Sequence, residues 1–449
     1  MDIQSRRAFI GSALAAGAFI AGCSKAKPKV SSIVPVLHEK APDGPVLKAG
    51  LVGCGGRGSG AAQDFIDASP NCEIIALGDV FQDRVDSARQ KIEEEKGQTV
   101  PKENCFVGFD AYQKVIDSGI DVMIHATPPH FRPQHFAAAV AAGKHVFIEK
   151  PMAVDPVGVK SIIETAGQAK TKGLTVISGT CYRHHKKVIE TYRLVAEGAI
   201  GDILAARAYF NTSQLWYKKR EEGWSDMEWM IRDWVNWCWL SGDHIVEQHV
   251  HNLDTMSLYI GANPVKAVGF GGRHRRVTGN QYDFFSVDFE YENGLHLSSM
   301  CRQIDGCANN VSDFIVGSKG STDCRGTIWN PDGSIAWKFD DAFREKQPRS
   351  KENEADGDTS GQVEVRSMYK QEHIDLVTSI RTSEGRNEAV ATAHSTLMGI
   401  MGRTAAYTGK EVTWQEMLDS VERLGPELYA MGTAKLDMTL PVPGVSKAT

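Results

Sequence analysis

Four side chains that can exchange protons follow a helical spacing between residues 242 and 260; they are His244, Glu247, His251 and Asp254. Such spacing places them on one face of a predicted helix. A carboxylate beside an imidazole raises its basicity and fixes its tautomer, which favours Glu247 supporting His251 as a general base. A structural histidine is the alternative. His-x-x-Glu-x-x-x-His also fits part of a metal site, but no third ligand is assignable, so no metal is expected.

A lysine stands where a short apolar run ends, in the sequence Glu149-Lys150-Pro151. Proline restricts the residue before it to extended conformations. An ammonium held in a partly dry pocket stabilises a developing alkoxide, whereas the alternative is an ordinary surface charge. Thr127, Pro128 and His130 follow the preceding apolar run in the same way. Ligands of open parallel sheets bind at these strand ends, so both segments are predicted to line a site.

A glycine-rich turn follows the first apolar run, residues 47–52; it contains Gly53, Gly55, Gly56, Arg57 and Gly58. The first glycine of G-x-G-x-x-G permits a tight turn, the second lets backbone N–H groups approach a pyrophosphate, and the third lets the next helix lie close to the strand. The helix that follows directs its N-terminus at the phosphates. The pattern predicts a dinucleotide site.

The second apolar run, residues 72–78, ends in Asp79. A carboxylate there accepts hydrogen bonds from both ribose hydroxyls and repels a 2′-phosphate, so NAD is favoured over NADP. The alternative is a cap for the helix that begins near Gln82. Arg84 would soften the preference for NAD.

Apolar runs and helical patterns alternate through residues 47–180, which predicts a doubly wound parallel sheet of the Rossmann type. Strands are expected at 47–52, 72–78, 121–126, 145–148 and 174–178, with helices at 131–142 and 157–172. Residues 181–449 are predicted to form an α+β domain whose large sheet is mostly antiparallel, with strands at 202–211, 264–271, 284–292, 294–302 and 312–316. Helical residues 387–407 are expected to return to the first domain, and an open sheet face suits a homo-oligomer contact.

These motifs together resemble the glucose-fructose oxidoreductase, inositol dehydrogenase and MocA (Gfo/Idh/MocA) family. The matching segments are GCGGRG at 53–58, Asp79, ATPPH at 126–130, EKP at 149–151 and GDHIVEQHVHNLD at 242–254. The resemblance implies an NAD(P)-dependent oxidoreductase with Lys150 beside the nicotinamide. It also implies that Glu247 and His251 complete the catalytic site, although the family's usual D-x-G-x-H is here Glu247-Gln248-His249-Val250-His251.

Six of the nine tryptophans lie between residues 216 and 239. Indole faces stack on sugar rings and indole N–H groups bond hydroxyls, which favours a carbohydrate pocket. An aromatic core or a subunit interface is the alternative. The expected substrate contacts are Arg183, His184, Trp237, Trp239 and His244.

The N-terminus, SRRAFIGSALAAGAFIAGC, is typical of a twin-arginine signal peptide that ends in a lipoprotein cleavage box. We expect residues 1–23 to be that signal, Cys23 to be lipidated, and residues 24–46 to form a tether. An amphipathic helix or an uncleaved anchor is the alternative. The protein is therefore expected in the periplasm or on the cell envelope, attached to membrane only through its N-terminus.

Net charge bears on the class of binding partner, and the cysteine pattern bears on disulfides. A net charge of −6 without long basic blocks argues against nucleic acid. The nine cysteines include no CxxC, and pairing of Cys301 with Cys307 is left open.

Three functions stay open on these residues. The first is oxidation of a secondary hydroxyl of a sugar or glycoside by a tightly held NAD. The second is a redox-neutral glycosidase that oxidises, eliminates and re-reduces. The third is a sugar-binding lipoprotein without turnover.

Overall fold

The first half of the chain is organised by short apolar strands that alternate with helices. The structure, a computed structural model, describes residues 34–340 and 367–445. Six parallel strands form one sheet in the order β3-β2-β1-β4-β5-β6. Their bounds are β1 Leu47–Val52, β2 Cys72–Asp79, β3 Cys105–Val107, β4 Val122–His125, β5 His145–Ile148 and β6 Val176–Ser178. The predicted doubly wound parallel sheet is confirmed, and its strand order reverses between β1 and β4.

Helices cover this sheet and bury its apolar residues. They are α2 Gly56–Ala68, α3 Gln82–Lys96, α4 Ala111–Asp117, α5 Arg132–Ala141 and α6 Pro156–Thr171. A helix from near the other end of the chain, α12 (Met368–Arg381), packs on α2 and contributes Ile374, Leu376 and Val377 to the same core. The core of the first half therefore depends on residues about 200 positions downstream of its last strand.

The second half contains a nine-stranded sheet in the order β14-β13-β12-β11-β7-β10-β9-β8-β15. The strands are β7 Ile203–Thr212, β8 Lys266–Gly272, β9 Phe284–Glu290, β10 His296–Gln303, β11 Asn310–Gly317, β12 Ser321–Thr322, β13 Thr327–Trp329, β14 Ile335–Lys338 and β15 Val412–Thr413. Every pairing is antiparallel except that of β7 with β10, so the predicted mostly antiparallel sheet is confirmed. The turn at Asn293-Gly294 joins β9 to β10, with Gly294 at φ +77°.

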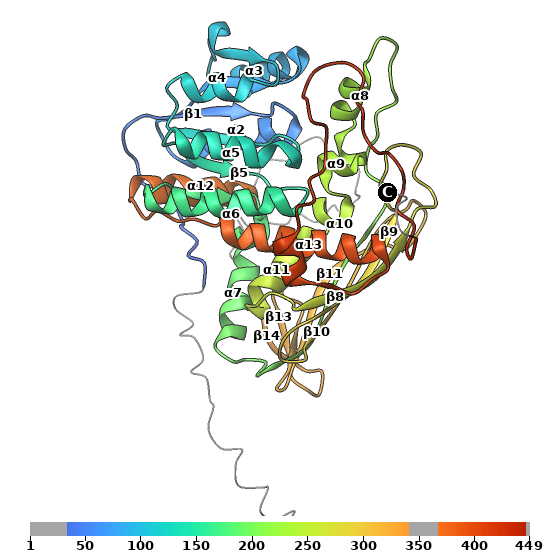
Figure 1. Cartoon of the computed structure of the whole chain (residues 1–449). Helices are drawn as coiled ribbons and strands as arrows, with labels where there is room; N and C mark the ends of the chain where they lie inside the picture. The colour runs from blue at the N-terminus through green and yellow to red at the C-terminus, as the bar shows by residue number, and fades with distance from the viewer. Residues whose placement is uncertain (1–33, 341–366, 446–449) are drawn as a thin grey trace, which may run out of the picture. The chain divides into compact units, whose positions relative to one another are not determined.

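The second half also contains helices that connect these strands. They are α7 Lys186–Ala196, α8 Asp226–Arg232, α9 Cys238–Ser241, α10 His244–Glu247, α11 Val250–Ile260, α13 Ala389–Thr408 and α14 Trp414–Asp419. Of these, α10, α11 and α13 pack on the sheet. Figure 1 shows α11 and α13 on the same side of the sheet, where α11 packs on β7 and α13 packs on both β8 and α6. Alternate residues on the other face, including Val268, Phe270 and Met300, are exposed.

Residues 35–46, expected to belong to a tether, pack against α12. Ala41 is fully buried, the His38 backbone N–H donates to Asp375 Oδ1 (2.9 Å), and Arg381 donates to the carbonyl of Pro42. The compact unit therefore begins at Pro35 rather than near Leu47. The predicted signal peptide and Cys23 lie outside the described residues.

Two general properties of the described chain concern membranes and thiols. No helix within residues 34–340 and 367–445 has the length and hydropathy required to cross a bilayer. Cys301 is buried and Cys307 exposed, and both are free thiols.

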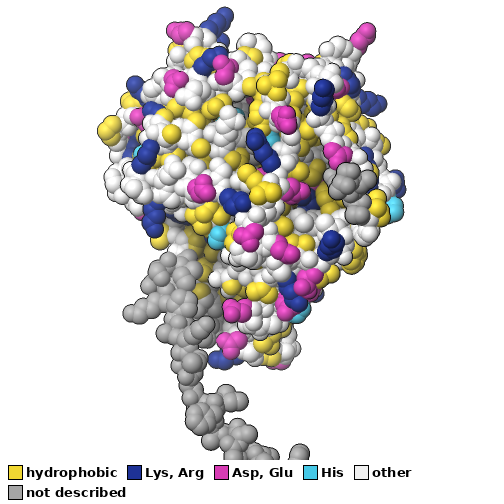
Figure 2. Space-filling model, viewed as in Figure 1, with side chains coloured by type: hydrophobic (Ala, Val, Ile, Leu, Met, Phe, Trp, Pro, Cys, Tyr) yellow, Lys and Arg dark blue, Asp and Glu magenta, His cyan; other side chains and the backbone are white. Residues whose placement is uncertain are grey.

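On the face drawn in Figure 2, acidic and basic side chains are interspersed.

Candidate active site

The glycine-rich turn between β1 and α2 is shaped by close backbone contacts. Gly53 has φ +96°, and a Cβ there would lie 2.6 Å from the Thr127 nitrogen; a Cβ on Gly58 would lie 1.9 Å from the Gly53 carbonyl oxygen. Gly55 and Gly56 have nothing within 4 Å of a Cβ position. The first and last glycines are thus required sterically, whereas the middle two leave open space. No side chain caps α2, so its first N–H groups remain available to an anion.

Asp79 connects this turn to the end of β2. Its Oδ2 accepts from the Cys54 N–H (2.7 Å) and its Oδ1 from the Phe81 N–H (3.0 Å). Burial raises the pKa of Asp79, and these two backbone donors oppose that rise. Each oxygen keeps a lone pair for a further donor, such as a ribose hydroxyl.

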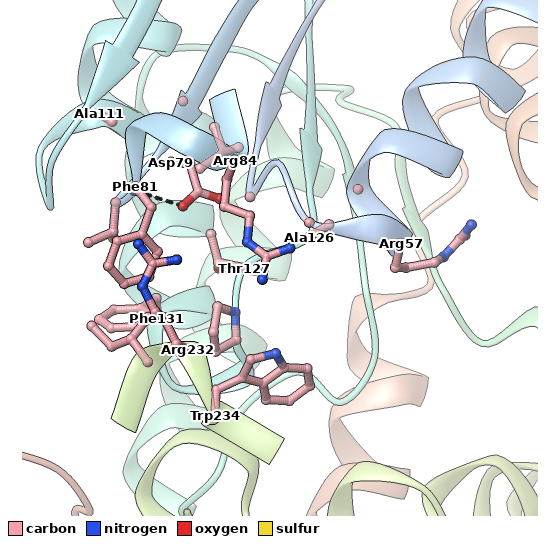
Figure 3. A pocket seen from close by; sticks show the side chains of 18 of the residues that line it. Arg57, Asp79, Phe81, Arg84, Ala111, Ala126, Thr127, Phe131, Arg232 and Trp234 are labelled. Carbon is pink, nitrogen blue, oxygen red and sulfur yellow. Dashed lines mark hydrogen bonds between the residues drawn. The ribbon is translucent and has the colours of Figure 1, made fainter. Parts of the chain in front are cut away.

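A cavity of about 530 Å³ adjoins the turn and Asp79. From the first half it is lined by the turn, Arg84, Phe109, Thr127, Pro128 and Phe131, and from the second half by residues 216–218, 231, 232 and 234. Figure 3 shows Asp79, Arg84, Thr127 and Trp234 around one space. The donor-rich helix start, the ribose acceptor and the glycine cradle fit an adenine dinucleotide, with Gly53, Gly55, Gly56, Gly58 and Asp79 as the residues that would hold it.

Arg57 borders the cavity but directs its guanidinium elsewhere (Figure 3). Its Nε donates to Glu149 Oε1 (2.5 Å) and its Nη2 to Glu372 Oε2 (3.0 Å), and it lies over the Tyr369 ring at 4.6 Å. Two buried carboxylates thus share one guanidinium. Arg57 and Glu149, both expected to bind cofactor, bind each other in the structure.

Lys150 is buried, with its side chain 9 % exposed. Its Nζ donates to the Glu247 carbonyl (2.6 Å) and to Glu247 Oε1 (3.0 Å). The pair joins β5 of the first half to α10 of the second. Lys150 and Glu247, predicted to serve one site, are therefore brought together, and the Lys150–Pro151 peptide is cis.

Arg132 links the lysine loop to the cavity wall. It is buried, and it donates to the Thr127 carbonyl through Nε (3.0 Å) and to the Pro151 carbonyl through Nη1 (2.5 Å). His125 and Ile148 are paired in the sheet, and Thr127 and Lys150 each follow their strand by two residues. The loop that carries Lys150 is thus adjacent to the loop that lines the cavity.

His251 lies near the same lysine but not against Glu247. Its Nδ1 is 3.9 Å from Cys181 Sγ, and its ring is 5.4 Å from the Tyr182 ring. Burial, followed by the charges of Lys150 and Arg325, holds the pKa of His251 well below its usual range. A neutral imidazole can accept a proton. The expected support by Glu247 is absent because Glu247 faces Lys150 and Gln248 instead.

The predicted single helix across 242–260 is interrupted. It forms α10 and α11, which are separated at Gln248 and His249. His244 consequently bonds Asp243 (3.0 Å) and packs on Phe285, away from Glu247 and His251. The single helix face predicted for His244, Glu247, His251 and Asp254 is therefore not continuous across this break.

The expected substrate residues and His130 do not line the cavity; Arg183 and His130 are partly buried, and His184, Trp237, Trp239 and His244 are buried. Arg183 bonds both oxygens of Asp254 (2.8 and 3.0 Å). His184 bonds Asp375 (2.7 Å) and Glu388 (3.3 Å). The third group is an aromatic cluster in which Trp239 packs on His130 and Trp237 packs on Trp229. Trp237 and Trp239 therefore belong to an aromatic core, which was the alternative to a carbohydrate pocket.

Sequence reasoning did not assign the cavity residues Tyr217, Lys218, Ile231 and Arg232 to any site. The only signal in the sequence was the tryptophan density around them. Trp216 and Trp234, members of that group, do line the cavity.

Comparison with known proteins agrees with this geometry. A family model described as an oxidoreductase family with an NAD-binding Rossmann fold matches residues 47–178, and a model of the Gfo/Idh/MocA C-terminal domain matches residues 188–323. A glycosyl hydrolase family 109 protein of Streptomyces coelicolor is 27 % identical over 44 % of this chain and 43 % of its own length. A 2,7-anhydro-N-acetylneuraminate hydratase of Escherichia coli is 24 % identical over 56 % and 60 %. The chain thus spans about half the length of these relatives.

Solved structures share the fold at low identity. GenD2 from gentamicin A biosynthesis in complex with NAD has a TM-score of 0.60 and 14 % identity, covering 84 % of this chain and 99 % of its own. A myo-inositol 2-dehydrogenase from Lactobacillus plantarum has a TM-score of 0.58 and 18 % identity, covering 82 % and 99 %. With both family models matched in order over residues 47–323, the chain belongs to the Gfo/Idh/MocA oxidoreductase family, and its first half is an NAD-binding Rossmann domain.

Proposed function

We propose that this protein is an exported NAD-dependent oxidoreductase that acts on a secondary hydroxyl of a sugar or glycoside and keeps its cofactor bound. The observation that carries the proposal is the buried Lys150 ammonium, which is held by Glu247 near a neutral His251, on a loop that Arg132 links to the cavity-lining Thr127. Inositol dehydrogenases among the structural neighbours support a substrate with ring hydroxyl groups.

Bound NAD would supply the hydride acceptor at this site. His251 would take the hydroxyl proton, because its imidazole is neutral and its Nε2 has no protein hydrogen bond among the described residues. Lys150 would stabilise the negative charge that develops on the same oxygen. Glu247 would act on Lys150, holding the ammonium in position through two acceptors.

The second candidate is redox-neutral cleavage of a glycoside. It is favoured by two relatives named as a glycosyl hydrolase family 109 protein and an α-N-acetylgalactosaminidase. Oxidation of a ring carbon acidifies the neighbouring C–H bond, so a base can remove that proton while the glycosidic group leaves. Water then adds to the double bond before the carbonyl is reduced again, and no net oxidant is consumed.

The test begins with acid quenching of the purified protein and identification of any nucleotide released. A panel of sugars and glycosides is then added in D₂O. Reduction of the bound nucleotide with an intact product supports the dehydrogenase, whereas a cleaved product carrying deuterium beside the oxidised carbon supports the glycosidase. If sugar binds and the nucleotide is never reduced, both reactions are refuted and the non-catalytic sugar-binding reading remains.

Export and assembly complete the proposal. A twin-arginine signal exports folded proteins, so a protein that keeps its NAD could carry it across the membrane. Cell fractionation and mass measurement of the mature N-terminus test export and lipidation at Cys23. We also propose a homo-oligomer formed through the open sheet face with Val268, Phe270 and Met300, which light scattering tests.

A further inference from the structure

A segment of the second half, residues 214–236, forms part of the wall of the dinucleotide cavity. We call this segment the clasp. It contributes Trp216, Tyr217, Lys218, Ile231, Arg232 and Trp234 to the lining. The opposite wall is the glycine turn and Asp79 from the first half. A dinucleotide lying along the turn is therefore enclosed by the clasp.

Hydrogen bonds join the first and last stretches of the clasp to each other. Trp229 Nε1 donates to the Lys218 carbonyl (2.8 Å), and the Lys218 N–H donates to Asp233 Oδ1 (2.6 Å). Asn236 Nδ2 donates to the Trp216 carbonyl (3.2 Å). These hydrogen bonds join residues 216–218 to residues 229–236, and both stretches line the cavity, so the two stretches move as one body if the clasp moves.

An apolar cluster and one arginine join the clasp to the first half. In the cluster, Met230 and Ile231 of the clasp lie with Phe81 and Phe131. Arg232 donates to both carboxylate oxygens of Asp83, at 3.1 and 3.0 Å. Its guanidinium also lies 3.9 Å from the Phe81 ring centre and 5.1 Å from that of Trp224 (Figure 3 shows Arg232 against Phe81). A guanidinium paired bidentately and placed over an aromatic face is held more firmly than an exposed ion pair. This contact is at the Asp79 end of the cavity, because Phe81 and Asp83 follow Asp79 directly.

The charges on the cavity lining suit an anionic ligand. Four cationic residues line it, of which Arg57 and Arg232 are paired with carboxylates and Arg84 and Lys218 have no ion pair among those described. Asp79 is the single acidic residue among the lining residues that the structure describes. The clasp supplies Lys218, one of the two cations without an ion pair. A diphosphate-bridged dinucleotide is an occupant of matching charge, with Asp79 reserved for the ribose hydroxyls.

From these contacts we infer that the clasp is the second half of the dinucleotide site and makes the bound cofactor slow to exchange. Release requires the clasp to separate from the first half, which breaks the Arg232–Asp83 pair, the Arg232–Phe81 contact and the apolar packing in the cluster of Met230 and Ile231 with Phe81 and Phe131. This inference rests on the proposed function, which needs a cofactor retained through turnover. It assigns a measurable share of that retention to Asp83 and Arg232.

The release rate of bound NADH tests the inference. Trp216 and Trp234 line the cavity, so energy transfer from tryptophan reports bound NADH, and excess NAD⁺ prevents rebinding. We expect Asp83→Asn to speed release about threefold, on the scale of a partly exposed ion pair. Arg232→Gln, which also loses the aromatic contact, should speed it about tenfold. Added salt should speed release from the unaltered protein more than from Asp83→Asn.

Asp86→Asn is the matched control. Asp86 is exposed on the same helix and bonds only Gln82 among the hydrogen bonds described for it, so this variant removes the same charge without touching the clasp. Asp83 is 59 % exposed, so its replacement leaves the fold intact. Equal release rates for Asp83→Asn, Arg232→Gln and the unaltered protein would overturn the clasp while the proposed function stands. A protein that binds no NADH would overturn both.

Discussion

Replacement of His184 by Gln should change how stability depends on pH. The His184 ring is fully buried, and its two nitrogens contact Asp375 Oδ2 (2.7 Å) and Glu388 Oε2 (3.3 Å). Two carboxylate partners require both nitrogens to donate, so the ring carries a proton and a positive charge. Burial opposes this charge, but Glu388 and Asp375 outweigh it and raise the pKa of His184 to about 9.

The magnitude follows from proton linkage. The pKa of His184 is raised from 6.5 to about 9 on folding, so the folded protein holds this proton more tightly than the unfolded chain. The resulting stability is fully present below pH 6.5 and is lost as the pH rises through 9. At 1.36 kcal/mol per pKa unit, the loss is about 3 kcal/mol. Asp375 and Glu388 act in the opposite range, because their own pKa values are lowered and their contribution disappears in acid.

Urea unfolding at pH 6.5 and pH 9.5 measures the effect. The difference in unfolding free energy between the unaltered protein and His184→Gln should shrink by about 3 kcal/mol between the two conditions. His185→Gln is the control, because burial lowers the pKa of His185 to about 4 and its ring is neutral throughout this range. A difference that stays constant from pH 6.5 to pH 9.5 would refute a charged His184.

Three further predictions concern the site and its surroundings. Lys150→Met should slow substrate oxidation by roughly 10²–10³-fold in single-turnover measurements of NADH formation, because no cation remains for the developing alkoxide. Adding Glu247→Gln should recover stability, measured by urea unfolding, without recovering the rate, since the buried carboxylate is no longer left unpaired. Gly58→Ala should abolish NAD binding in calorimetry, because its Cβ would meet the Gly53 carbonyl at 1.9 Å. Tyr429→Phe should lower the unfolding free energy by about 1 kcal/mol, because it loses the 2.7 Å hydrogen bond with His130. Unchanged rates, unchanged NAD affinity and unchanged unfolding, respectively, would contradict them.

The parallel sheet was predictable because its signals are local. A buried strand that leads directly into a glycine turn leaves few alternatives, and the strands β1, β2, β4 and β5 lie within one or two residues of their expected bounds. The antiparallel sheet was predictable from alternation, and the Asn293-Gly294 turn fixed one hairpin. Both patterns depend on neighbouring residues alone.

The partners of charged side chains were not predictable in the same way. Helical spacing placed Glu247 beside His251, but the backbone changes course at Gln248, and Glu247 meets a lysine about 100 residues upstream. Likewise, residues 35–46 look like a linker by composition, yet Ala41 is buried against a helix that lies more than 300 residues away in sequence. Packing between residues far apart in the sequence decides such contacts, and local sequence periodicity does not predict them.

Arg57 shows how a local sequence pattern and long-range contacts together determine the position of a side chain. Its place in a glycine turn predicts a cofactor contact, but its guanidinium is held by Glu149 and Glu372. Arg132 makes a second link, from Thr127 to Pro151. Arg57 thereby joins the glycine turn to Glu149, and Arg132 joins the loop after β4 to Pro151, so the two guanidinium groups bind on either side of Lys150. The backbone of the lysine loop is consequently tied to two cavity-lining segments within the first half, while the Lys150 ammonium itself is held by Glu247 of α10. Because α10 lies outside the clasp, opening of the clasp can release cofactor without breaking the contacts that hold the lysine.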